Sequence, residues 1–140
     1  MYKKISKFPH RRLRHLLALL FTWGLSLPLV ILDFSLEIYH HVAFPLCGIP
    51  IVKRSSYIRI DRQKLAYLSL FDKLGCMYCG YANGFAAYMV KIAGDTEKYW
   101  CGIKHKEGGG FIPQPHQKDF LPYDDEQAFK NFVDKKNNCK

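Results

Sequence analysis

The residues best suited to chemistry are three cysteines and one histidine in the middle of the chain. Cys76 and Cys79 form a C-x-x-C pair, and Cys101 and His105 follow further along at an i,i+4 spacing. Three thiolates and one imidazole complete the tetrahedral ligand set of a structural zinc site. The pattern therefore predicts a Cys3His metal site. Zinc is the metal expected first, and iron is the alternative because it binds the same soft ligands.

The C-x-x-C pair has a second interpretation as a redox-active dithiol of a membrane-bound thiol oxidoreductase or redox-metal enzyme. Such a pair supports exchange between thiol and disulfide. Against this interpretation, no thioredoxin-like βαβ pattern surrounds Cys76 and Cys79. In a third interpretation, the three thiols and His105 bind no metal. The sequence leaves all three open, and it does not decide whether the protein is an enzyme.

A second group of polar residues follows an apolar run near the N-terminus. It consists of Asp33, Glu37, His40 and His41. Glu37-x-x-His40 has the i,i+3 spacing that di-iron carboxylate bundles use. A complete di-iron site needs a second such motif, and the sequence does not contain one. We therefore interpret the group as a polar cluster that ends a membrane helix, where ionisable residues are candidates for function.

The apolar run itself, Leu16–Leu32, contains no charged residue. With its edges it reaches the roughly 20 residues that a membrane span requires. Gly24 and Pro28 would weaken a soluble helix, but membrane helices tolerate both residue types. No small-x-small cleavage site follows the run, so a retained anchor is favoured over a cleaved signal peptide.

The formal net charge of +9 is concentrated on either side of this apolar run. The first 15 residues carry six lysines and arginines and no acid. Such flanks attract anionic lipid headgroups and favour a cytoplasmic N-terminus in the cell inner membrane. Proteins that bind nucleic acid collect their charge on a folded face instead, so no nucleic-acid partner is expected. A protein partner in the membrane is consistent with this kind of anchor.

A second basic cluster bears on which side of the membrane holds the cysteines. The apolar stretch Val42–Val52 is too short and too rich in proline to cross, and Lys53, Arg54, Arg59, Arg62 and Lys64 follow it. Basic flanks on both sides fit a re-entrant or surface-lying arrangement with both flanks in the cytoplasm. Unpaired cysteines persist in reducing compartments, which also favours a cytoplasmic C-terminal domain.

The expected fold class is mostly α, with an N-terminal membrane helix followed by a small helical juxtamembrane domain. Asp61 is a candidate cap for a helix over Arg62–Leu74. Gly75 and Gly80 predict a turn or break around the first cysteines. A helix that ends at Gly94-Asp95 is expected next, with a short helix leading into Cys101. In the helix that ends at Gly94-Asp95, apolar residues recur at i, i+4, i+7 and i+11 and form one face, which consists of Tyr81, Phe85, Tyr88 and Ile92.

The C-terminal part is expected to be a linker and one helix. Gly108–Gly110 is a flexible tract. Asp124-x-x-Gln127 resembles a capping box for the last helix, whose inward-facing residues would be Phe129, Phe132 and Val133. The expected segments are a basic flank (1–15), the membrane helix with its interfacial end (16–41), an apolar interfacial segment (42–52), a Cys/His helical domain (53–107) and the linker with the C-terminal helix (108–140).

Three further residues have ligand-type side chains. His116 is a spare metal ligand at most. Cys47 stands in an apolar setting and is expected to be a small buried residue. Cys139 is expected to be a free thiol in the tail.

About forty per cent of the chain resembles an uncharacterised family of small bacterial membrane proteins. The matching words are Asp61-Arg62, Leu65-Ala66-Tyr67-Leu68, Cys76-Met-Tyr-Cys79-Gly-Tyr-Ala-Asn83-Gly84 and Thr96-Glu97-x-Tyr99-Trp100-Cys101-x-Ile103-Lys104-His105. The resemblance implies no activity, but it adds Asn83, Glu97, Tyr99 and Trp100 to the residues of interest. Members of that family usually carry proline where this chain has Gly102, which loosens the turn before His105.

Overall fold

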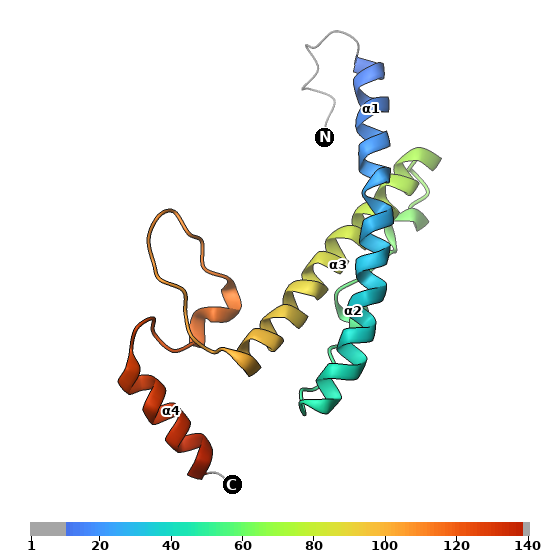
Figure 1. The fold of residues 1–140 in the computed structure, drawn as a ribbon. Coiled ribbons are helices and arrows are strands. Elements are labelled where there is room, and N and C mark those ends of the chain that lie inside the picture. The colour runs from blue at the N-terminus through green and yellow to red at the C-terminus, as the bar shows by residue number, and fades with distance from the viewer. Residues whose placement is uncertain (1–10, 139–140) are drawn as a thin grey trace. The chain divides into compact units, whose positions relative to one another are not determined.

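The structure is a computed structural model that describes residues 11–138. Its elements are α1 (Arg11–Gly24), α2 (Ser26–Leu46), 3-10 helices at Arg54–Ser56 and Arg62–Lys64, α3 (Leu70–Trp100), a 3-10 helix at Pro115–Asp119, and α4 (Glu126–Asn138) (Figure 1). Over these residues no strand forms, and an isolated bridge pairs Ile103 with Leu121. The predicted fold class, mostly α with an apolar helix first, is confirmed.

The described chain forms two compact units, and the boundary falls within α3. Unit 1 ends at Tyr88, and unit 2 begins at Met89. Unit 1 contains α1, α2, the segment after them and the first part of α3. Unit 2 contains the last part of α3, the following loop and α4.

α1 and α2 follow one another almost without interruption. Leu25, the residue between them, has helical backbone angles, and its N–H donates to the Phe21 carbonyl (3.1 Å). Pro28 explains the irregularity, because proline has no N–H to offer the carbonyl of Gly24. Leu16–Leu46 is therefore a helical segment of 31 residues that is long and apolar enough to cross a membrane. It contains no re-entrant turn.

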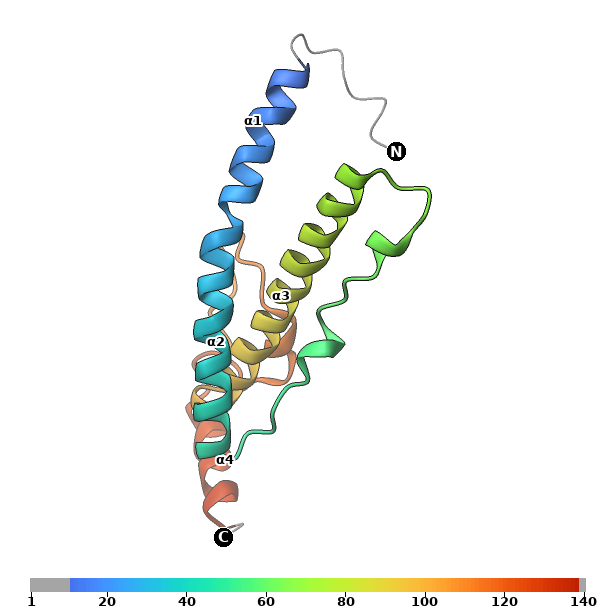
Figure 2. The ribbon, with the colours of Figure 1, turned by 90° about the vertical axis from the view of Figure 1, so that its right-hand side faces the viewer.

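α2 and the first part of α3 run side by side in the same direction. Tyr81 contacts Asp33 and Tyr88 contacts His40, and both pairs are 48 residues apart in the sequence. Parallel neighbours require a connection that runs back along the helices. Figure 2 shows the chain between α2 and α3 making this return. We call residues 47–69 the return segment.

The predicted start of the helix at Arg62 is wrong. Arg62–Lys64 forms only a 3-10 turn, Asp61 makes no capping hydrogen bond, and α3 begins at Leu70. Ser69 caps α3 instead, because its hydroxyl oxygen accepts the N–H of Asp72 (3.2 Å). The capping chemistry is of the predicted type, but it occurs eight residues later along the chain.

α3 also continues through the glycines at which a break or an end is predicted, so those predictions are wrong. Gly75, Gly80 and Gly94 all lie inside α3. A Cβ on Gly80 would lie 2.9 Å from the Arg59 carbonyl oxygen, and one on Gly94 would lie 2.8 Å from Cγ of His116. The last two glycines therefore make room for close neighbours and do not end the helix.

The predicted cap of the last helix is displaced by one residue. Asp125 caps α4, because its Oδ1 accepts the Ala128 N–H (2.8 Å), whereas Asp124 has a positive φ of 62°. The prediction that the aromatic residues of this helix face inward is also wrong. Phe129 and Phe132 are 47% and 52% exposed.

Candidate functional site

An ion pair joins the end of the apolar run to the return segment. Asp33 follows Leu32, and Arg54 begins the first 3-10 helix. Nη1 of Arg54 contacts Oδ1 of Asp33, and Nη2 donates to Oδ2 (2.6 Å). Nη1 also donates to Oε1 of Glu37 (2.8 Å). Hydrogen bonding to Asp33 raises the pKa of Arg54 above its usual value. Asp33 is only 8% exposed, so its carboxylate is largely shielded from water, whereas the Arg54 side chain is 36% exposed.

Two tyrosines of α3 contact the same group from the other side. Tyr81 donates its hydroxyl proton to Oδ2 of Asp33 (2.8 Å). Oη of Tyr88 lies 2.9 Å from Nδ1 of His40, and both of these side chains are fully buried. The guanidinium carbon of Arg54 lies 5.7 Å from the centroid of the Tyr88 ring, which joins Tyr88 to the ion pair. Burial raises the pKa of Tyr88 to about 12, so its hydroxyl keeps its proton at neutral pH.

These hydrogen bonds fix the protonation state of His40. The Val52 N–H donates to Nε2 of His40 (3.0 Å), so Nε2 must offer a lone pair and the ring is neutral with its proton on Nδ1. That N–H donates to Oη of Tyr88. The donors are therefore ordered from Val52 through His40 to Tyr88. We call the six side chains of this arrangement the polar network: Asp33, Glu37, His40, Arg54, Tyr81 and Tyr88.

Glu37, His40 and His41 also offer ligand atoms that lie within 4.8 Å of one another. One carboxylate and two imidazoles form the ligand set of several iron and zinc sites. Both ring nitrogens of His40, however, are already engaged by Val52 and Tyr88. A metal would have to displace one of these partners, and the other two side chains supply only two ligands. The hydrogen bonds therefore favour a structural role for His40.

The four residues of the predicted Cys3His site are divided between the two units. Cys76 and Cys79 lie inside α3 in unit 1, one half-buried and the other exposed. Their i,i+3 spacing places them on one side of that helix. Cys101 and His105 follow α3 in unit 2, and both are exposed. The four-residue site stays a prediction. Cys47 is half-buried after α2, and Cys139 lies outside the described residues.

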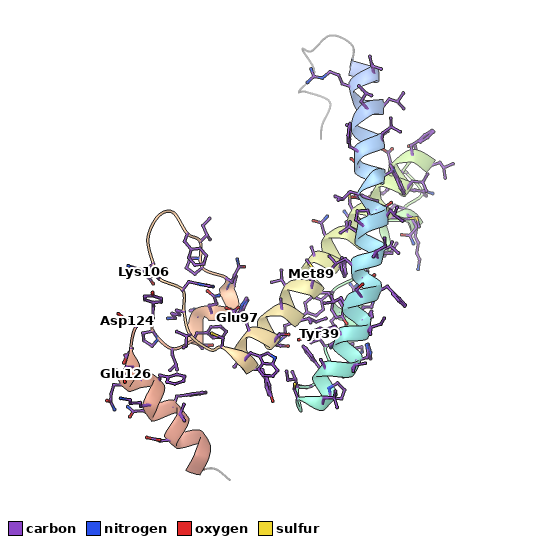
Figure 3. All side chains as sticks on the ribbon, in the orientation of Figure 1. Tyr39, Met89, Glu97, Lys106, Asp124 and Glu126 are labelled. Atoms are coloured by element: carbon purple, nitrogen blue, oxygen red, sulfur yellow. The ribbon has the colours of Figure 1, made fainter. Side chains whose placement is uncertain are left out.

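Unit 2 has a polar cluster centred on Glu97. Oε2 of Glu97 lies 2.6 Å from Nε2 of His116, and the side-chain amide of Gln117 donates to Oε1 (2.7 Å). The hydrogen bond with His116 lowers the pKa of Glu97 below its usual value. Glu97 belongs to the last turns of α3 (Figure 3), so this cluster ties the end of that helix to the 3-10 helix Pro115–Asp119.

A cavity of about 370 Å³ lies beside the predicted ligand His105 in unit 2. Lys104 and Lys118 line it together with Phe111, whose ring meets the His105 ring edge-on at a centroid distance of 5.2 Å. Glu107 adds an acidic side chain to the same walls. Because the charges have opposite signs, the cavity does not select a single class of ligand.

Sequence reasoning identified the polar residues of α2 but missed their partners. Arg54 looks like one member of a basic flank, and Tyr81 and Tyr88 look like members of an apolar helical face. The sequence does contain one signal, a matching spacing. Asp33 and His40 are seven residues apart, and so are Tyr81 and Tyr88, whose hydroxyls contact them. Two helices that run parallel bring such equally spaced polar groups together.

Comparisons with protein-family models, with curated proteins and with solved structures found no match. The resemblance to small bacterial membrane proteins therefore stays a prediction from the sequence.

Proposed function

We propose that the protein is a membrane-anchored interaction or assembly module with a structural zinc site. The observation that carries the proposal is the uncovered apolar surface of α1 and α2. Leu20, Phe21 and Leu27 are 65%, 81% and 68% exposed, and similar neighbours surround them. Proteins rarely leave a continuous apolar surface of this size in water. A bilayer of the usual hydrocarbon thickness would cover it.

The polar network supports the proposal because it gives the anchor a fixed partner. A charged carboxylate at the edge of an apolar segment is costly unless it is paired. Asp33 is paired with Arg54 and Tyr81, and all three belong to unit 1. The network thereby fixes α2 to the helix that carries Cys76 and Cys79. A metal bound to those thiols would be held at a constant distance from the bilayer.

Zinc is proposed because two thiols three residues apart on a helix can bind one ion. The other two ligands would be Cys101 and His105, as the sequence predicts, and they reach the same ion only if the helix between Cys79 and Cys101 is interrupted, because 22 residues of continuous helix measure roughly 33 Å. Thiolates and imidazole satisfy tetrahedral zinc, and the binding free energy adds to the stability of a small fold. Iron is the alternative metal, because it accepts the same ligands.

The second candidate function is thiol oxidoreduction by Cys76 and Cys79. The exposure of Cys79 favours it, since a reactive thiol must be accessible. The position of the pair counts against it. A helix N-terminus stabilises a thiolate within the first turn, and Cys76 is the seventh residue of α3. Reversible disulfide formation at neutral pH, in protein free of bound metal, would favour this function over a zinc module.

We propose that the N-terminus faces the cytoplasm and that anionic headgroups of the inner membrane bind the basic flanks. A straight helix that crosses the membrane once would place the part of unit 1 that follows Asp33 on the opposite side from the N-terminus. A helix that lies along the membrane surface would keep that part in the cytoplasm. The sequence favours the cytoplasm for the C-terminal domain. Labelling with an impermeant maleimide in intact cells and in inverted vesicles would distinguish the two arrangements, if a cysteine is introduced by Ile112→Cys at a position that is 82% exposed and its labelling is measured over that of the unmodified chain.

Alkaline carbonate extraction of the full chain tests the anchor. We expect the protein to stay in the membrane pellet, and we expect the double variant Leu20→Lys/Leu27→Lys to be released in part, because charge in the apolar segment opposes insertion. Ile112→Lys is the matched control, since Ile112 is 82% exposed but lies in unit 2. Complete release of the unmodified protein would contradict the proposal.

A further inference from the structure

One face of α3 changes from buried to exposed along its length. The helical repeat of this face includes Leu70, Leu74 and Met77 and continues through Phe85 and Tyr88. The last two residues are fully buried, whereas the first three are 71%, 41% and 39% exposed. The apolar pattern of a buried face thus extends about two helical turns beyond the part that the protein itself covers.

Two aromatic side chains enlarge this uncovered end. Phe71 is 84% exposed, and Tyr67, just before the helix, is 81% exposed. A large apolar surface at helical spacing marks a site of contact with another molecule or with lipid. We call the following five residues the exposed stripe: Tyr67, Leu70, Phe71, Leu74 and Met77.

The exposed stripe lies at the level of the apolar anchor. The ring of Tyr78, the next residue after the stripe, lies 5.6 Å from the ring of Trp23 between centroids. Trp23 stands near the middle of Leu16–Leu32, the run that we propose to be in the bilayer. Figures 1 and 2 show the start of α3 at the same height along unit 1 as α1. The stripe therefore continues the exposed apolar surface of the anchor.

Basic residues near the stripe suit a lipid environment. Arg62 and Lys64 precede it and are exposed. Long basic side chains can extend their charge to the headgroups while their stems stay in apolar surroundings. The nearby carboxylate of Asp72 accepts a hydrogen bond from the Ser69 hydroxyl (2.6 Å), so the one acid of this turn is satisfied within the helix cap.

We propose that the exposed stripe inserts among the acyl chains of the same bilayer that holds the anchor, a step that rests on the proposed membrane anchor. The start of α3 then enters the lipid without crossing it. Cys76 lies between Leu74 and Met77 of the stripe, and Cys79 follows Met77 by two residues, at the end of the inserted part. The occupant of the stripe is lipid, because the stripe continues the apolar surface of the anchor and basic side chains precede it.

Quenching of tryptophan fluorescence by brominated phosphatidylcholine tests the proposal on the full chain in lipid vesicles. Three single-tryptophan proteins are compared. The first retains Trp23 alone, with Trp100→Phe. The second adds Phe71→Trp to Trp23→Phe/Trp100→Phe. The third adds Ala87→Trp to the same background. Ala87 is exposed on α3 and precedes Tyr88, whose hydroxyl contacts His40, so it lies at the level of His40 and beyond the apolar run Leu16–Leu32.

We expect the indole introduced by Phe71→Trp to lose fluorescence to about the same extent as Trp23, and the indole introduced by Ala87→Trp to lose little. Quenching of Trp23 without quenching at position 71 would overturn the proposal and leave the anchor intact. Absence of quenching at both positions would overturn the anchor as well. Dilution of the protein into excess lipid separates copies of the chain from one another. If position 71 is quenched only after such dilution, a second copy covers the stripe at higher density, and the proposal is overturned.

Discussion

The two units each centre a polar cluster on a carboxylate, but the clusters differ in burial. The carboxylate side chain of Asp33 in unit 1 is 11% exposed and that of Glu97 in unit 2 is 28% exposed, although the partner Arg54, at 36%, is more exposed than His116, at 25%. Breaking one partner of a buried pair strands a charge and costs several kcal/mol. Breaking a pair that water can reach costs about 1 kcal/mol or less. Pairs of similar chemistry therefore contribute more to the stability of unit 1 than to that of unit 2.

The difference also extends to the number of partners. The Asp33 cluster belongs to a network of six side chains that joins α2, the return segment and α3. The Glu97 cluster joins the end of α3 to one 3-10 helix through two hydrogen bonds. We therefore expect substitutions in the polar network to destabilise the protein much more than substitutions around Glu97.

Arg54→Ala should give the largest effect. It leaves the carboxylates of Asp33 and Glu37 without their cation. We expect a loss of about 3 kcal/mol in the free energy of unfolding. This value is at the low end for a buried pair because Arg54 is partly exposed. Unfolding by SDS in mixed micelles measures it. Arg59→Ala, at an exposed position of the same segment, should change little. An Arg54→Ala loss no larger than that of the control would contradict the comparison.

Gly84→Ala should have the next largest effect. A Cβ there would lie 2.7 Å from the Tyr57 carbonyl oxygen and 2.8 Å from Cα of Ile58, and backbone cannot move aside as a flexible side chain can. We expect a loss of about 2 kcal/mol from overpacking. Gly75→Ala is the matched control in the same helix, since a Cβ at Gly75 would meet no atom within 4 Å. It should stabilise the helix by about 0.5–1 kcal/mol. Equal effects of the two variants would show that the return segment does not lie against α3.

Tyr88→Phe should cost about 1–2 kcal/mol. It removes the acceptor of the His40 Nδ1–H while it keeps the aromatic ring. Tyr123→Phe, at a 55% exposed position in unit 2, is the control and should be close to neutral. The same micelle titration compares them. A neutral result for Tyr88→Phe would mean that the donor order from Val52 through His40 to Tyr88 contributes nothing to stability.

Glu97→Gln should have the smallest effect, and its effect should depend on pH. Because the folded pKa of Glu97 lies below its ordinary value of about 4.3, its contribution to stability is present above that value and is lost as the pH falls through the folded pKa. The unmodified protein should therefore lose stability in unit 2 below about pH 4.3 more steeply than the variant.

Trp100, near the end of α3, reports this acid transition by fluorescence in the background Trp23→Phe. Glu107→Gln is the control, since it removes a nearby acid that has no hydrogen bond to His116. An identical acid transition in the protein with and without Glu97→Gln would contradict the assignment.

The sequence was sufficient for the helical fold class and the apolar helix, because hydrophobic periodicity and the absence of charge are local properties. It also identified Asp33, Glu37 and His40 as an unusual polar group. Element ends were less accessible. Gly80 and Gly94 read as helix breakers, yet each makes room for a neighbour that is distant in sequence, Arg59 and His116. A glycine that breaks a helix and one that admits a close contact have the same local pattern.

The partners of the polar network could not be predicted for a related reason. Only the parallel arrangement of α2 and α3 brings Tyr81 to Asp33 and Tyr88 to His40, and this arrangement depends on the return segment. Arg54 had an equally good interpretation as a headgroup-binding residue. The predicted Cys3His site still depends on the sequence pattern, since its residues belong to both units.

The metal content of the full chain, purified anaerobically in detergent with its free thiols titrated on the same sample, tests the proposed zinc module most directly. We predict about one zinc per chain with the predicted ligand thiols protected, its loss in Cys76→Ser/Cys79→Ser, and its retention in the matched control Cys47→Ser. Protein without bound metal and with all its thiols freely reactive would contradict the zinc module.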